Sequence, residues 1–182
     1  AGLSGSSGGL VGMYESSEDL DRLQTLLDAS AAGAGSHLSS IITGDRRLTA
    51  AALCAELVGM RLLSAATVTA DGRPLSGPVD GYFLHGSFWF STSRDSVRAR
   101  HLLRRPAISV THVPDVHLAV SAHGSAALFD FPGPETGELR QAMLDHYLPQ
   151  QGPEFADWLD AMDDGVAVRV DADKLFVFHM AG

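Results

Sequence analysis

The spacing of hydrophobic positions changes near residue 60, from the three-to-four-residue repeat of helices to the alternation of strands. In the first part, leucines recur on one helical face after Ser16 and Asp19, whose spacing is that of a capping box. This pattern predicts a first helix over residues 17–30. Thr49 precedes the segment AAALCAELVGM and predicts the cap of a second helix. The intervening GAGSH predicts a loop or a helix break.

The middle of the chain alternates between apolar and polar residues and contains the dipeptides typical of tight turns. Asp71-Gly72 and His85-Gly86 predict two hairpin turns, and Pro114-Asp115 predicts another turn. A short helix is expected before Pro106, because the residue preceding a proline disfavours the helical region. The alternation predicts strands over residues 62–70, 74–84, 87–92, 107–113 and 116–130.

The last part of the chain returns to helical spacing and then to strands. Pro134 and Pro153 are suited to the first turns of two amphipathic helices. Residues 165–180 predict a pair of strands around a turn at residues 171–173. Six or seven strands with few helices indicate a mainly β protein with added helices (α+β), built around a small barrel.

Composition narrows the function classes. A chain of 182 residues with 45% hydrophobic residues fits one globular domain, and its net charge of -9 argues against nucleic-acid binding. No apolar run approaches the roughly 20 residues of a membrane span, so we expect a cytoplasmic protein with no membrane partner. The single cysteine, Cys54, is interpreted as a buried, inert thiol. Lys174 is the only lysine among 13 basic residues, which suggests a GC-rich genome.

The histidines are weak candidates for metal or haem binding. His112, His117 and His123 fall within one predicted hairpin, but six residues of strand span about 20 Å, too far for two ligands of one ion. We therefore expect no metal site. His179 is a weak candidate for a haem ligand. The chain has no G-x-S-x-G, Walker or H-E-x-x-H motif, which argues against the common hydrolase and NTPase mechanisms.

One strand-to-helix junction carries the strongest chemical signal. In FWFSTSRDSVRARHLLRRP, an aromatic strand ends in Ser91 and Thr92, and Ser96 and Arg98 follow at a helix start, where free N–H groups favour an anion such as phosphate. A capped surface helix with solvated arginines explains the same residues equally well. The preceding strand contains Gly77, Pro78 and Gly81, which favour an edge or bulged segment that a flat ligand can approach. Irregular packing is the alternative.

The order of these pieces resembles the flavin-binding split β-barrels related to pyridoxamine 5'-phosphate oxidase. The resemblance covers residues 46–180 and is most specific between residues 66 and 110. It consists of A-T-V-x-x-D-G-R-P, an aromatic strand ending in Ser/Thr, a basic helix, and R-x-P before the next strand. It implies a split-barrel domain over residues 46–182 preceded by a helical extension over 13–45, while the Gly/Ser-rich residues 1–12 before Met13 are interpreted as a flexible tail or expression remnant.

The resemblance also implies a homodimer with FMN at the subunit interface. The FMN phosphate would lie against the end of the aromatic strand and the basic helix, and the ring along the glycine-containing strand. The implied phosphate-binding residues are Ser91, Thr92, Ser96 and Arg98, and the ring would be contacted by Gly77, Pro78, Val79 and Asp80. The departure is Val97, where the oxidases carry an arginine of a Ser-Arg-Lys run. One phosphate ligand is therefore expected to be lost, or to be replaced by Arg94 or Arg100.

The implied function is an FMN-binding oxidoreductase that transfers a hydride to or from a small-molecule substrate. The arginine-rich ending expected of a vitamin B6 oxidase is missing from KLFVFHMAG, so that substrate is not expected. One alternative is a reductase dependent on the deazaflavin coenzyme F420, which is found in many GC-rich actinobacteria. The other is a flavin- or haem-binding protein without catalysis. Catalytic residues are unknown, with Asp80, Tyr82 and His85 as candidates near the ring.

Overall fold

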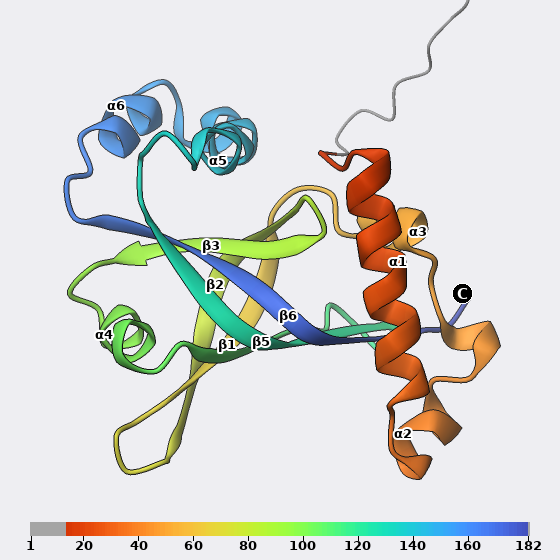
Figure 1. Ribbon diagram of the computed structural model, residues 1–182. Coiled ribbons are helices and arrows are strands. Elements are labelled where there is room, and N and C mark those ends of the chain that lie inside the picture. Colours follow the sequence, from red (N-terminus) through yellow and green to blue (C-terminus); the bar gives the residue numbers. More distant parts are fainter. Residues whose placement is uncertain (1–13, 182) are drawn as a thin grey trace, which may run out of the picture.

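Six antiparallel strands form a closed barrel in the computed structural model, which describes residues 14–181 (Figure 1). Around the barrel the strands follow the order β1-β2-β3-β6-β5-β4. The hairpins β1–β2, β2–β3 and β4–β5 therefore join neighbours, β5 and β6 pair although α5 and α6 lie between them in the chain, and β1 closes the barrel against β4. The strands are β1 (Arg61–Val68), β2 (Pro74–Leu84), β3 (Ser87–Ser93), β4 (Ala107–His112), β5 (Leu118–Asp130) and β6 (Gly165–His179).

The barrel interior is filled by one side of each strand. Along β3, Phe88 and Phe90 belong to the interior cluster, whereas Trp89 between them belongs to a second cluster outside the barrel. Phe83 and Phe88 pack edge to face, with their ring centroids 4.9 Å apart. The two-residue period of a strand separates the two clusters, because successive side chains point to opposite faces.

Two of the hairpins predicted from sequence are confirmed in their turn geometry. Gly72 has φ 84°, and its N–H donates to the carbonyl oxygen of Thr69. His85 and Gly86 have φ 52° and 75°, the left-handed values that a two-residue hairpin turn requires. His85 is the only residue other than glycine with positive φ in the described part of the chain.

The helices before the barrel lie at one end of it. Helix α1 (Ser17–Ala32) carries the predicted capping box between Ser16 and Asp19, and packs along β6, where the N–H of Leu175 donates to Ser30 Oγ at 2.9 Å. Helix α2 (Ser36–Ile41), the short η1 (Gly44–Arg46) and α3 (Ala50–Glu56) complete this group, with Thr49 capping α3. The predicted tail over residues 1–12 lies outside the described residues.

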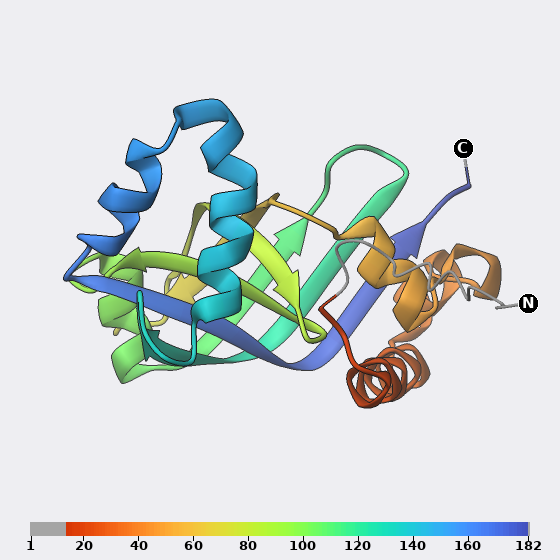
Figure 2. The same cartoon turned by 90° about the horizontal axis from the view of Figure 1, so that it is seen from above.

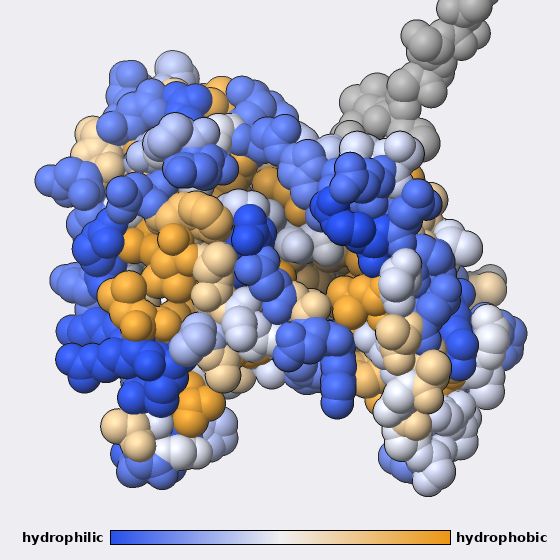
Figure 3. Space-filling model, in the orientation of Figure 1, coloured by the Kyte–Doolittle hydropathy of each residue, from blue (hydrophilic) through white to orange (hydrophobic). Residues whose placement is uncertain are grey.

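The remaining helices lie toward the other end of the barrel, as Figures 1 and 2 show. They are α4 (Val97–Arg104), α5 (Gly137–Gln151) and α6 (Glu154–Asp160). The outer cluster that contains Trp89 includes buried side chains of α5 and α6, so these helices cover one outer face of the sheet. In the space-filling view apolar surface gathers on the barrel between α4 and α6, while the helices present mostly polar surface (Figure 3).

The predicted fold class is confirmed as α+β: a closed six-stranded barrel with added helices around it. One prediction is wrong. The chain from residue 165 to 179 is a single strand, β6, and not a pair of strands turning at residues 171–173. The strand pairs with β5 on both sides of this segment, and a register shift between His123 and Gly124 absorbs the irregularity. A bulge therefore stands where the aspartates suggested a turn.

Two further expectations concern the cysteine and membrane-spanning segments. Cys54 is buried, and burial raises the pKa of its thiol to about 12, so the expectation of an inert thiol agrees with its surroundings. Within residues 14–181, no helix is both long enough and apolar enough to cross a bilayer.

Candidate functional site

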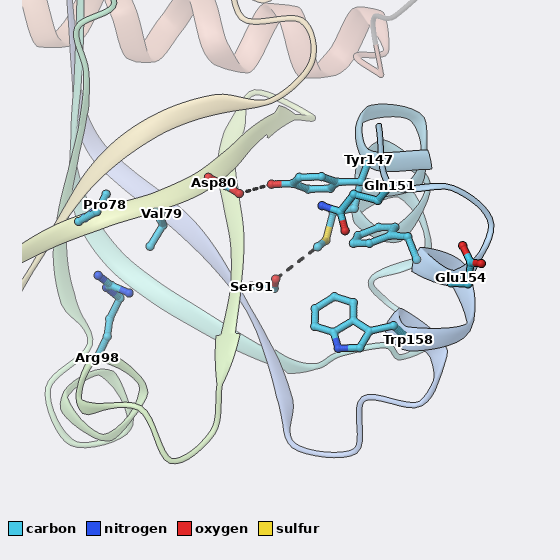
Figure 4. Close-up of a pocket in the computed structure, with 11 residues that line it drawn as sticks. Pro78, Val79, Asp80, Ser91, Arg98, Tyr147, Gln151, Glu154 and Trp158 are labelled. Atoms are coloured by element: carbon cyan, nitrogen blue, oxygen red, sulfur yellow. Dashed lines mark hydrogen bonds between the residues drawn. The ribbon is translucent and has the colours of Figure 1, made fainter. Parts of the chain in front are cut away.

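An open pocket with a volume of about 830 Å³ lies where β2 and β3 separate. Figure 4 shows Pro78, Val79 and Arg98 on one side of it, the residues of α5 and α6 on the other, and Ser91 between the two sides. The lining residues are Pro78, Val79 and Asp80 of β2, Ser91 of β3, Arg98 of α4, Met143, Tyr147 and Gln151 of α5, and Glu154, Phe155 and Trp158 of α6.

Strand pairing explains why the pocket forms at this place. Strand β2 pairs with β1 from Pro74 to Gly81, but it pairs with β3 only from Gly81 onward. Strand β3 pairs with β6 from Trp89 to Ser93, so beyond Phe90 it pairs with β6 and not with β2. The segment from Pro74 to Asp80 therefore has a free edge among the described residues, in agreement with the edge segment expected from its glycines and proline.

Arg98 is a half-buried cation without a counterion in the described part of the chain. No carboxylate within residues 14–181 pairs with its guanidinium, which lies 5.9 Å from the centre of the Phe90 ring. Burial lowers the pKa of Arg98 from its ordinary value, although an arginine stays charged at neutral pH. A Cβ added to Gly77 would lie 3.0 Å from Nη2 of Arg98, so the glycine leaves room for the guanidinium. The pocket thus holds an uncompensated positive charge beside a free strand edge.

The hydroxyl groups at the start of α4 are engaged locally. Ser96 caps the helix, accepting a hydrogen bond from the N–H of Ala99 at 3.1 Å. Thr92 donates its hydroxyl to Ser96 Oγ at 3.1 Å. Neither residue lines the pocket in this structure, whereas Ser91 does, with its hydroxyl 3.9 Å from the sulfur of Met143. Ligand contacts of Thr92 and Ser96 therefore remain a prediction.

The basic residues expected to replace the missing arginine lie outside the pocket lining. Val97 is 46% exposed at the first position of α4. Arg94 is paired with Asp130 at 2.5 Å, and Arg100 is exposed. Among the described residues, Arg98 is thus the only basic side chain that lines this pocket.

Helices α5 and α6 supply an aromatic wall that the sequence reasoning missed. The rings of Tyr147 and Phe155 have centroids 4.9 Å apart, and those of Phe155 and Trp158 are 5.5 Å apart. Tyr147 donates its hydroxyl to the carboxylate of Asp80 across the pocket (Figure 4). Burial, together with this contact and the negative charge of Asp80, raises the pKa of Tyr147. In the sequence these residues fall in the two amphipathic helices predicted after Pro134 and Pro153, and helical spacing does not show what such helices pack against.

Two of the candidate catalytic residues lie elsewhere. Tyr82 is buried beneath α5, and its hydroxyl has no hydrogen-bond partner among the described residues. His85 lies at the turn between β2 and β3, where its ring nitrogens contact Asp19 of α1 and Glu138 of α5. Asp80 is the candidate that lines the pocket.

The histidines have local partners. His112 Nδ1 lies 2.9 Å from the carbonyl oxygen of Leu62, and His123 Nδ1 lies 2.8 Å from Ser109 Oγ. His117 and His179 lie at the far end of β5 and β6, away from the pocket lining. Within residues 14–181, no three His, Cys, Asp or Glu side chains are grouped to hold a metal ion.

The pocket combines the positive charge of Arg98 with the free edge of β2 and an opposing aromatic wall. A guanidinium forms charge-assisted hydrogen bonds to phosphate oxygens, and a free edge with few side chains accepts a planar ring. No residue of the lining has the arrangement of a nucleophile and its base. The geometry therefore suits binding of a planar, phosphate-bearing molecule better than covalent catalysis by the protein.

Comparison with known proteins gives the chain a family and a set of structural neighbours. A family profile described as pyridoxamine 5'-phosphate oxidase matches residues 51–160. No curated protein sequence matches the chain. A conserved hypothetical protein from Mycobacterium tuberculosis has a similar structure, with a TM-score of 0.60 and 24% identity over 75% of this chain and 88% of that chain.

Two other solved structures have names that mention a cofactor. The haem storage protein HutZ of Vibrio cholerae has a TM-score of 0.54 and 20% identity, over 65% of this chain and 86% of that one. A pyridoxamine 5'-phosphate oxidase-related, FMN-binding protein of Nostoc punctiforme has a TM-score of 0.49 and 20% identity, over 67% and 75% of the two chains. At these identities the Mycobacterium tuberculosis and Vibrio cholerae proteins show a shared fold and no more.

Proposed function

The chain belongs to the pyridoxamine 5'-phosphate oxidase family, and from this premise we propose that it is an FMN-binding oxidoreductase that acts on a small molecule. When bound, FMN would supply the hydride transfer, so the protein needs to contribute binding, orientation and exclusion of water. This division of roles agrees with a pocket that has no nucleophile and base of its own.

The observation that carries the proposal is the unpaired, half-buried guanidinium of Arg98. A buried cation without a counterion costs free energy, and a bound phosphate would remove that cost. Arg98 would hold the FMN phosphate. Gly77, Pro78 and Val79 would lie along the ring, because the free edge of β2 and the pocket lining meet there.

The remaining site residues have narrower proposed roles. Ser91 and Thr92 at the end of β3, with Ser96, would add hydroxyl contacts to the phosphate after small rotations of their side chains. The hydrogen bond from Tyr147 would fix the carboxylate of Asp80 at the rim of the ring site. Helices α5 and α6 would limit the access of water from the opposite side.

A homodimer is part of the proposal. Leu62 of β1 is 62% exposed and Val116, between β4 and β5, is 74% exposed, so apolar side chains remain uncovered on the barrel. A second copy would remove this apolar surface from water. Light scattering that gives the mass of one chain across the micromolar range would contradict the dimer.

Two cofactors compete with FMN. Coenzyme F420 also carries a phosphate, as a diester, and a planar ring, and therefore fits the same charge and edge. Haem binding without turnover is favoured by the shared fold with the haem storage protein, but His117 and His179 do not line the pocket. The test is titration of the purified protein with FMN, F420 and haem, followed by absorbance and fluorescence. Saturable FMN binding with ring absorbance supports the proposal, whereas exclusive binding of F420 or haem overturns it.

A further inference from the structure

We propose that the aromatic wall of Tyr147, Phe155 and Trp158 selects a substrate with a planar aromatic ring that is uncharged or cationic, and that the pocket rejects anionic substrates. The inference rests on the proposed function in one respect, because it assigns Arg98 to the phosphate of the cofactor. It goes beyond that function by naming the chemical class of the substrate.

Trp158 provides the first argument. Its side chain is 58% exposed although it stacks on Phe155, which is only 7% exposed. In Figure 4 the indole of Trp158 extends from α6 toward the centre of the pocket. A large aromatic surface left in water beside a cavity, with a buried aromatic ring behind it, is a platform on which a planar ligand gains both burial and stacking.

The charges of the lining provide the second argument. Asp80 and Glu154 are the acidic residues of the pocket, and Arg98 is its only basic residue within the described chain. A dianionic phosphate on Arg98 would cancel that positive charge, and the charges that remain on the protein side would both be negative. A second anion would then meet repulsion with no cation to offset it, whereas a cation would be attracted.

The two sides of the pocket also separate these roles in space. Arg98 lies with Pro78 and Val79 against the barrel, while Glu154 and Trp158 lie on the opposite wall (Figure 4). A volume of about 830 Å³ is within the range of sites that hold drug-sized ligands, so a ring along β2 leaves space before the aromatic wall. The substrate would therefore lie between the cofactor ring and Trp158, in a pocket whose remaining charges are those of Asp80 and Glu154.

The test uses three probes of nearly equal shape at neutral pH: N-methylquinolinium, quinoline and quinoline-4-carboxylate. Their dissociation constants are measured by calorimetry on the full chain saturated with FMN. We expect N-methylquinolinium to bind most tightly, quinoline next, and the carboxylate at least about tenfold more weakly than the cation, as expected for one ion contact in a partly exposed site.

Variants then separate the wall from the charge. Trp158→Leu should weaken both quinoline and N-methylquinolinium by about 2- to 30-fold, the range of an aromatic or cation–π contact. Glu154→Gln should weaken only the cation and reduce its advantage over quinoline. Asp157→Asn is the matched control, because this acidic residue lies on the same helix but does not line the pocket. It should leave all three affinities unchanged.

The outcomes of the inference and of the proposed function can be told apart. FMN binding with equal affinity for cation and carboxylate overturns the inference alone. Absence of binding by all three probes also overturns it, as does coverage of Trp158 by a second copy of the chain. If FMN does not bind while the protein still prefers the cation and depends on Trp158, the cofactor assignment fails and the aromatic wall remains a binding site.

Discussion

Replacing Arg98 by methionine removes the positive charge from the pocket while it keeps most of the apolar length of the side chain over Phe90. The guanidinium is half-buried, has no carboxylate partner in residues 14–181 and adjoins Gly77 at the free edge of β2. If it binds the phosphate of FMN, the substitution should weaken FMN and leave the ring contacts unchanged.

The magnitude follows from the type of contact. One charge-assisted hydrogen bond in a partly buried site contributes about 1.5 to 3 kcal/mol. At about 1.4 kcal/mol for each factor of ten, the dissociation constant of FMN should rise roughly 10- to 150-fold. Riboflavin has the same ring without the phosphate, so its affinity should change by less than about twofold. The unfolding free energy without ligand should stay constant or rise, because an uncompensated buried cation is removed.

The assay is quenching of flavin fluorescence on titration with protein, for FMN and riboflavin in parallel. Arg100→Met is the matched control, because Arg100 lies on the same helix, is exposed and is not part of the pocket lining. Equal FMN affinity in Arg98→Met and the unsubstituted protein would refute the phosphate assignment. An equal loss for FMN and riboflavin would show that the substitution disturbs the ring site instead.

Three further predictions concern the surroundings of the site. Gly77→Ala should weaken FMN by roughly 1 kcal/mol in the same titration, because the new Cβ would lie 3.0 Å from Nη2 of Arg98 and displace it; unchanged affinity would contradict this. Burial lowers the pKa of His85, but its contacts with the carboxylates of Asp19 and Glu138 raise it by more, so the pKa lies above its ordinary value. The stability that these contacts add is present below about pH 6.5 and is lost as the pH rises through the folded-state pKa. The unfolding free energy measured in urea should therefore be lower at about pH 8 than at about pH 6, by less than about 1 kcal/mol because His85 is partly exposed, and His85→Asn should abolish this difference. The same pH dependence in both proteins would refute the contribution. Ser16→Ala removes the cap of α1 and should lower the unfolding free energy by about 1 kcal/mol, and no change would mean that α1 unfolds separately.

Local chemistry made much of the candidate site predictable. The end of β3 at Ser93, the cap at Ser96 and the end of α4 before Pro106 all follow from residues adjacent in sequence. The free edge of β2 could also be expected, because Pro78 has no N–H to donate and glycine packs poorly in a central strand. Arg98 could also be singled out from the sequence, because a helix start beside hydroxyl residues is a local feature.

Other parts of the site depend on contacts between distant segments. The aromatic wall reaches the pocket only because α5 and α6 fold back over the barrel, which brings Tyr147 to Asp80, 67 residues earlier in the chain. His85 was a candidate for the ring site, yet it lies between Asp19 and Glu138, 66 and 53 residues away. Helical spacing shows which face of a helix is buried but not what it is buried against.

The sequence alone determined the kinds of elements, their caps and turns, and the family pattern, because these depend on backbone preferences and side-chain periodicity over a few residues. Tertiary structure decided the strand register and which charged side chains are paired. The aspartates near residue 172 indicated a turn, but pairing with β5 kept β6 as one strand with a bulge. Tertiary packing likewise left Arg98 without a counterion among residues 14–181 and gave Arg94 one in Asp130, because pairing depends on distances between segments that sequence spacing does not fix.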